Sequence, residues 1–273
     1  MTLHLFRLEC LRMLRDPRYL ALAVVAPIGF YLLFATIFGG GPTQPGELKG
    51  TVEIMVAMAA YGAIWGALSA TGPRLAHERS SGWLEQLRAM PVTGRHLLTA
   101  KLAAGLAVAL PALVLVCVTA VVAKGVRLEA WQWAALVPAM WLGTLPFALL
   151  GVVVGLLVGP EAAFPLSYGL YMAASALGGL WVPPARLSSA LQEVAHTLPT
   201  YRLADLGWRI AAGHAPTWAD LGVLAAWSAG LAGLTVLVQQ RGPSRGRGRG
   251  RGRSQERRAR PAEDGAASAL SAG

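Results

Sequence analysis

The sequence predicts an all-α integral membrane protein with six transmembrane helices. Only 14% of its 273 residues are charged, whereas a soluble domain usually carries about 25%. The charges are also segregated, and several long apolar stretches contain none. Uncharged stretches of about 18 residues or more are typical of transmembrane helices. The net charge of +10 is concentrated near the N-terminus, between residues 74 and 101, and in the C-terminal tail.

Residues 1–18 are predicted to form an amphipathic helix that lies in the membrane interface ahead of the first span. Within residues 3–16, apolar side chains fall on one arc of a helix and most polar side chains fall on the other. The apolar arc holds Leu3, Phe6, Cys10, Met13 and Leu14, and the polar arc holds His4, Glu9, Arg12, Arg15 and Asp16. Arginines on such an arc face lipid phosphates. The alternative is a plain cytoplasmic extension of the first span.

Residues 19–240 are predicted to form a six-helix transmembrane domain. The predicted spans are Tyr19–Phe38, Ile54–Gly72, Leu102–Ala123, a helix within Ala130–Val158, Ala162–Trp181 and Leu221–Val238. Tryptophans near the span edges fit an interfacial aromatic belt. Prolines occur inside several spans, where neighbouring helices can satisfy the freed carbonyl groups. They indicate either kinks that let helices move or prolines that are tolerated in a static bundle.

Basic residues are distributed unequally between the connections, and this predicts the orientation of the chain. Arginines and lysines cluster before the first span, between the second and third spans, and after the sixth. The connections on the other side hold only Lys49, Lys124, Arg127, Arg186, Arg202 and Arg209. By the positive-inside rule, both termini and the segment 74–101 are predicted to be cytoplasmic.

The longest connection on the outer side, residues 182–220, is not a simple polar loop. Apolar residues recur in it at helical spacing and are interrupted at Pro199. We expect two short outer helices between the fifth and sixth spans, which dip into the outer leaflet or cap the bundle. The alternative is an ordinary amphipathic surface loop.

The C-terminal tail, residues 241–273, alternates arginine with glycine in its first half and shows no apolar periodicity. Such a composition predicts disorder. Alternating arginines can contact the phosphates of RNA or of acidic lipid, but no aromatic residue is interleaved to stack on bases. We therefore expect contact with membrane lipid and no nucleic-acid partner.

The residue patterns of common catalytic and cofactor sites are missing from the sequence. No GxxxxGK[ST] motif is present to cradle nucleotide phosphates, and the five histidines lack metal-ligand spacing. Cys10 and Cys117 are predicted to be free thiols. Glu53, Glu161 and Asp220 lie at span edges, whereas a proton-driven transporter normally keeps an acidic residue deep in its bundle. We expect a protein that is not an enzyme, binds no cofactor or metal, and draws its energy from elsewhere.

A charged, helix-forming segment, residues 78–91, reads ERSSGWLEQLRAMP and lies between two long uncharged runs. Two apolar spans need only a short turn between them, so the segment indicates a binding partner outside the membrane. Glu78 and Glu85 could pair with basic groups on that partner, while Trp83 and Leu84 supply buried anchors. The alternative is a solvated loop helix whose charges only set topology.

The order of these features resembles the permease subunit of ABC-2-type exporters, over residues from about 1 to 240. The segment has the family's form E-x-x-x-G-x-L-E-x-L-x-x-x-P. Its matching residues are Glu78, Gly82, Leu84, Glu85, Leu87 and Pro91. Trp83 stands where the family usually has threonine. The stretch Leu198-Pro199-Thr200-Tyr201 also resembles the family's motif before the last span.

The resemblance implies a cell-membrane permease that dimerises, most simply with a second copy of itself, and pairs with a separate ABC-type ATP-binding subunit. Residues 78–91 would then be a cytoplasmic coupling helix seated in a cleft of that ATPase. Export is also implied by the resemblance, and the apolar, aromatic-rich spans suit an amphiphilic cargo: a drug-like compound, a lipid or a lipid-linked glycan. The rival interpretation is a non-transporting membrane anchor or sensor that docks a cytoplasmic partner.

Overall fold

The computed structural model describes residues 20–40, 48–81, 94–181 and 188–241, and every regular element within them is helical. The all-α fold class is therefore confirmed for this part of the chain. Contacts divide the chain into one unit that ends at Val236 and a second, Leu237–Gly273, whose described part is the last turn of the final helix. The elements in chain order are the π-helical turn η1 (Leu20–Val25), α3 (Ala26–Ile37), α4 (Gly50–Ser80), α6 (Gly94–Lys124), α7 (Ala130–Leu142), α8 (Leu145–Leu157), α9 (Pro160–Leu177), α10 (Ser189–Thr197), α11 (Pro199–Ala211) and α12 (Trp218–Arg241).

Four stretches of the described chain are long and apolar enough to cross a membrane. They are α4, α6, α7 taken together with α8, and α12, and they correspond to the predicted second, third, fourth and sixth spans. In the first predicted span the apolar stretch is shorter, Ala23–Ile37. The fifth predicted span corresponds to α9, which is not one of the four long apolar stretches. This helix carries polar residues and two prolines among its 18 residues. The chain is a multi-pass membrane protein, and the exact six-span arrangement stays a prediction.

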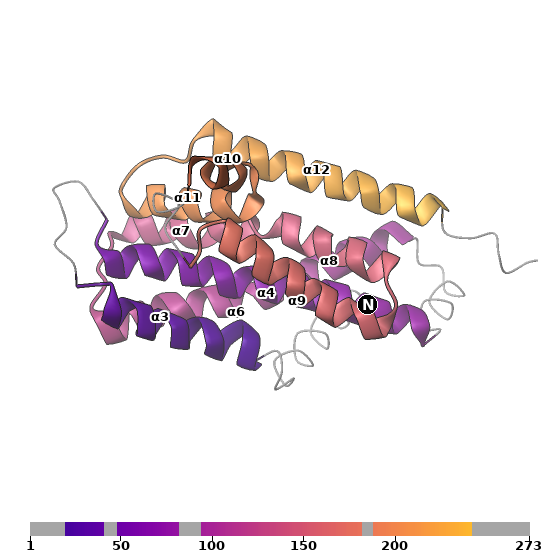
Figure 1. The fold of residues 1–273 in the computed structure, drawn as a ribbon, viewed down its shortest axis with the longest axis horizontal. Helices are drawn as coiled ribbons and strands as arrows, with labels where there is room; N and C mark the ends of the chain where they lie inside the picture. The colour runs from indigo at the N-terminus through magenta and orange to yellow at the C-terminus, as the bar shows by residue number, and fades with distance from the viewer. Residues whose placement is uncertain (1–19, 41–47, 82–93, 182–187, 242–273) are drawn as a thin grey trace, which may run out of the picture. The chain divides into compact units, whose positions relative to one another are not determined.

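Helix α4 is the central element, and it packs against α3, α6, α8, α9 and α11 (Figure 1). In its most apolar stretch, 89% of the residues are buried inside the molecule. Alanine and glycine dominate that stretch, because small side chains let neighbouring helix backbones approach closely on several sides.

The closest of these approaches joins α4 to α8. A Cβ atom at Gly155 would lie 2.6 Å from the carbonyl oxygen of Gly72, and one at Gly151 would lie 2.7 Å from the carbonyl oxygen of Leu68. Thr71 reinforces the contact by donating a hydrogen bond from Oγ1 to the carbonyl oxygen of Ala148, at 3.0 Å. These contacts fix the C-terminal half of α4 to α8.

Helix α4 extends beyond the predicted end of the second span. That span was expected to stop at Gly72, before Pro73, but α4 continues through Pro73 to Ser80. A proline removes one backbone hydrogen bond without ending a membrane helix that its neighbours hold in place. Glu78, expected in a separate helix, therefore belongs to the last turn of α4.

The predicted fourth span consists of two helices, α7 and α8, which are separated at Gly143 and Thr144. Pro146 lacks the amide hydrogen that would bond to the carbonyl of Leu142, so the break falls where the helix cannot close. Gly143 also faces α11 closely, because a Cβ atom there would lie 2.6 Å from Leu203 Cδ1.

Two short helices, α10 and α11, follow the fifth predicted span, and this confirms the prediction of two helices interrupted at Pro199. Pro199 occupies the first turn of α11, where the missing amide hydrogen costs no helical hydrogen bond. The predicted interfacial helix at residues 1–18, residues 82–91 of the partner-binding segment and most of the 241–273 tail lie outside the described residues.

Candidate functional site

The predicted partner-binding segment is described at its beginning only. Glu78 lies in the last turn of α4, and Gly82, Trp83, Leu84, Glu85, Leu87 and Pro91 lie outside the described residues. What the structure does define is the base of the segment: the end of α4, from which residues 82–93 depart, and the start of α6, to which they return.

An ion pair joins the two sides of this base. Nζ of Lys101, on α6, lies 2.5 Å from Oε1 of Glu78, and Nε of Arg74 lies 3.5 Å from the same oxygen. The Lys101 and Glu78 side chains are only 9% and 14% exposed, so solvent screens their attraction weakly. Glu78 was predicted to bind a partner, and the structure places its charge beside two cations of its own chain.

Arg79, next to Glu78, contacts α8, another helix that packs against α4. Its Nη1 donates a hydrogen bond of 2.8 Å to the carbonyl oxygen of Gly155 and a second to that of Leu156. Both acceptors lie in the last turn of α8, whose carbonyl groups lack partners within the helix. A cation is favourable there because the C-terminal end of a helix carries a partial negative charge. The end of α4 is therefore attached to α6 by Glu78 and to α8 by Arg79.

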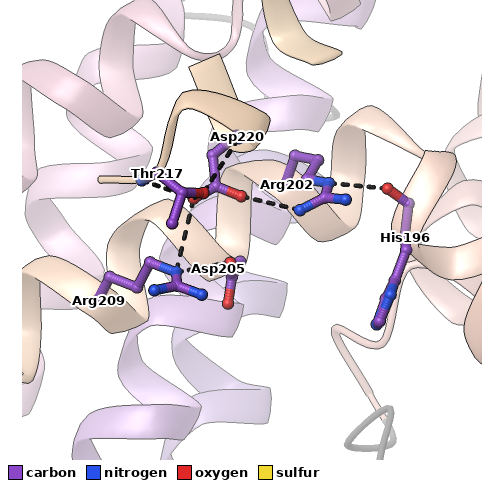
Figure 2. Close-up of polar contacts among 6 residues, drawn as sticks. All are labelled: His196, Arg202, Asp205, Arg209, Thr217 and Asp220. Atoms are coloured by element: carbon purple, nitrogen blue, oxygen red, sulfur yellow. Dashed lines mark hydrogen bonds and ion pairs between the residues drawn. The ribbon is translucent and has the colours of Figure 1, made fainter. Parts of the chain in front are cut away.

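A second polar cluster lies at the opposite ends of the helices, between α11 and the start of α12 (Figure 2). Asp220 is fully buried. It receives hydrogen bonds from Nη1 of Arg202 at 3.2 Å and from the backbone nitrogen of Thr217 at 3.1 Å, and its Oδ2 lies 3.6 Å from Nε of Arg209. The negative charge of this buried carboxylate is therefore balanced by the side chains of Arg202 and Arg209.

Asp205 forms the second acidic member of the cluster. Its Oδ2 accepts a hydrogen bond of 2.9 Å from Nε of Arg209. Burial raises the pKa of the Asp205 carboxyl above its ordinary value, and the hydrogen bond from Arg209 offsets this in part. Arg202 also donates from Nε to the carbonyl oxygen of His196, at 2.8 Å, so the cluster links α10, α11 and α12.

Sequence reasoning missed this cluster. It placed Asp220 at a span edge and counted Arg202 and Arg209 only as outer charges. One signal was available: Thr217 and Asp220 are three residues apart just before an apolar run, the spacing of a capping box. The reciprocal bond from the Asp220 amide to Thr217 Oγ1, at 3.3 Å, is present. The contacts with the arginines depend on how α11 folds back, and no local pattern encodes that.

An aromatic cluster fills the interface between α4 and α9. Trp65 lies edge-on to Phe164 and Tyr168, with ring centroids 5.7 and 5.5 Å away, and 5.1 Å from Tyr171. Tyr61, also on α4, lies 4.6 Å from Tyr171. Trp65, Tyr61 and Tyr171 are buried, so their rings pack on one another, whereas Phe164 at the edge of the cluster is 40% exposed.

A few buried polar atoms in and beside this cluster have no hydrogen-bond partner among the described residues. They include Trp65 Nε1, Ser167 Oγ and Ser175 Oγ. Buried polar groups are normally paired, so those that remain are candidates for contact with a bound molecule or water. In the same described ranges, no three His, Cys, Asp or Glu side chains are grouped so that they could hold a metal ion.

Comparison with known proteins places the chain among membrane transporters. The model of the family described as "ABC-2 type transporter" matches residues 2–206. A relative named "Putative transport permease YvfS", from Bacillus subtilis (strain 168), is 24% identical over 221 residues. That alignment covers 80% of this chain and 89% of the relative. The family match includes residues 78–91 and the base of this segment.

Proposed function

The chain belongs to the ABC-2 type transporter family, and from this premise we propose that it is the permease subunit of an ATP-driven exporter. A separate ATP-binding subunit supplies the energy, and the active assembly holds two permease copies. The termini and the segment 78–91 face the cytoplasm, where the ATPase docks. ATP binding by the partner moves the helices between inward-open and outward-open states.

The observation that carries this proposal is the geometry at the base of segment 82–93. The Glu78–Lys101 ion pair holds the two sides of the base together, and Arg79 attaches the same turn to α8. A segment mounted in this way transmits a push from outside into several spans at once. A flexible connector between two spans would not require these contacts at its base.

The cargo we propose is amphiphilic: a drug-like compound, a lipid or a lipid-linked glycan. Support comes from the aromatic cluster around Trp65, whose edge ring Phe164 is 40% exposed and which holds buried polar atoms without a hydrogen-bond partner among the described residues. The rings of that cluster belong to uncharged side chains, so the cluster offers a small ion no charged ligand.

Reversal of one charge in the partner-binding segment tests the docking of the ATPase. Glu85→Arg places a cation where we propose that an anion meets a basic group of the ATPase. Loss of one partner from such a pair costs about 2–5 kcal/mol. We expect Glu85→Arg to insert normally, to lose co-purification with the ATPase, and to lose stimulation of ATP hydrolysis.

Two further variants make this test specific. Gly82→Pro leaves the charges in place but distorts the backbone of the segment, and it is expected to weaken association as well. Arg127→Glu is the control, because Arg127 is exposed at the opposite ends of the helices, between α6 and α7. Full association and activity in Glu85→Arg would reduce the segment to a connector. Association without stimulated hydrolysis in the wild type would favour the non-transporting anchor.

A further inference from the structure

The α8–α9 hairpin is the part of the bundle that joins the base of segment 82–93 to the aromatic cluster. Helix α8 ends at Leu157, and α9 begins at Pro160 after a connection of two residues. The first four turns of α9 carry Phe164, Tyr168 and Tyr171, which pack on Trp65. A displacement of the end of α8 therefore reaches these aromatic rings through a connection too short to absorb it.

The polar contact between α4 and the end of α8 is made by the side chain of Arg79. Arg79 donates from Nη1 to the carbonyl oxygens of both Gly155 and Leu156. Its own backbone lies one residue before Ser80, where α4 ends, and residues 82–93 follow shortly after. Gly72 and Leu75, which precede Arg79 in α4, pack on the same Gly155. Arg79 adds a hydrogen-bonded contact with the end of α8 that lies closer to the end of α4 than either of these.

We propose that Arg79 is a positioning residue that fixes the α8–α9 hairpin to the base of segment 82–93, so that movement of this segment is passed to α9 and its aromatic rings. The inference rests on the proposed function, because the docked ATPase is what moves the segment. The attachment itself is a property of the permease alone. The two parts are therefore tested by different measurements.

Hydrogen exchange tests the attachment in the purified permease without any ATPase. The amides of Val158 and Ala163 bond to the carbonyls of Val154 and Gly159, on either side of the hairpin connection. Arg79→Gln shortens the side chain and removes its charge. We expect roughly two- to tenfold faster exchange at these two amides, the scale of a lost charged contact at a helix end, with the amides of α11 unchanged. Unchanged exchange at Val158 and Ala163 would overturn the proposal.

A fluorescent reporter tests the transmission. In a background without Cys10 and Cys117, bimane is attached at Phe164→Cys, which is in the first turns of α9 and 40% exposed. The permease is purified with its ATPase, and the response to a non-hydrolysable ATP analogue is recorded. We expect Arg79→Gln to keep association with the ATPase and to lose most of the fluorescence change. Arg79→Lys, which retains a charged donor, should keep part of it.

Matched controls separate the possible results. His77→Gln alters an exposed side chain in the same turn of α4 and should leave both measurements at the wild-type level. A full fluorescence response in Arg79→Gln would overturn the proposal, as would loss of association, because Arg79 would then contact the ATPase itself. A wild-type chain that binds no ATPase would contradict the proposed function, while hydrogen exchange would still decide whether Arg79 holds the hairpin.

Discussion

Arg202 and Asp220 join α11 to the first turn of α12 by an ion pair with Nη1 and Oδ1 3.2 Å apart. The arginine side chain is 18% exposed and the aspartate is fully buried. The turn between α11 and α12 thus depends on a buried carboxylate, whose negative charge is balanced by an arginine of the same chain. A buried charge of this kind is stable only while its partners remain in place.

Removal of this carboxylate is the first test. Asp220→Ala leaves Arg202 without its acidic partner and removes the capping contacts of Thr217. We expect a loss of about 3 kcal/mol in the free energy of unfolding, measured by thermal or denaturant unfolding in detergent. Glu193→Ala, at an exposed site on α10, is the control and should change stability little. Equal stability of the two variants would show that the pair contributes nothing.

The pKa of Asp205 predicts a pH effect with a defined sign. Burial raises this pKa in the folded protein above its ordinary value of 3.8, so the folded protein holds the proton more tightly than the unfolded chain does. The ionised carboxylate therefore costs stability near neutral pH, and this cost is lost as the pH falls through the raised pKa. Asp205→Asn removes the titration. Its stability relative to wild type should decrease as the pH is lowered from 7 to 4, and an increase would contradict the assignment.

The Glu78–Lys101 pair predicts non-additive mutations. Lys101→Met deprives a largely buried carboxylate of its nearest cation and should destabilise the protein by about 1–3 kcal/mol. In the double variant Glu78→Met and Lys101→Met neither member of this pair is left without the other, so it should lose less stability than the sum of the two single variants. Additive losses, measured by thermal unfolding, would mean that the two side chains do not interact.

Gly151 allows a test of the packing between α4 and α8. A methyl group there would overlap Oγ1 of Thr71 and lie 2.7 Å from a backbone oxygen. Gly151→Ala should therefore cost about 1–3 kcal/mol through overpacking. Gly169→Ala, on α9, is the matched control because nothing lies within 4 Å of its Cβ position. If both variants unfold at the same temperature, the close approach is absent.

Thiol labelling tests the predicted orientation. In a background without native cysteines, single cysteines at residues 44 and 190 should react with a membrane-impermeant maleimide in intact cells. Cysteines at residues 80 and 250 should react only after the membrane is opened. Labelling at residue 80 from outside would place the base of segment 82–93 on the wrong side and contradict the positive-inside prediction.

The membrane class and the family could be predicted from the sequence because both depend on patterns along the chain. Long uncharged runs mark the spans, and Pro199 marks the boundary between α10 and α11. The end of α4 could not be predicted, because Pro73 stops a helix unless its neighbours hold it, and those neighbours are distant in sequence. The contacts of Asp220 with Arg202 and Arg209 were missed for the same reason. The role of segment 78–91 stays a prediction, and its attachment through Glu78 and Arg79 could not be predicted because it depends on residues 23 and 76 positions away.

The burial of α4 has a consequence for how the protein is made. Of the four long apolar stretches, α4 is the least hydrophobic and the most enclosed, with 89% of its apolar stretch buried against 17% for α12. A helix that is largely enclosed by its neighbours needs little hydrophobicity in the finished protein. During synthesis, however, α4 leaves the ribosome before α6, α8 and α9 exist. It must therefore enter the bilayer while its small side chains still face lipid, and its retention there depends on neighbours that arrive later. Biogenesis of this permease is predicted to be limited at α4, and α12 should insert readily in isolation.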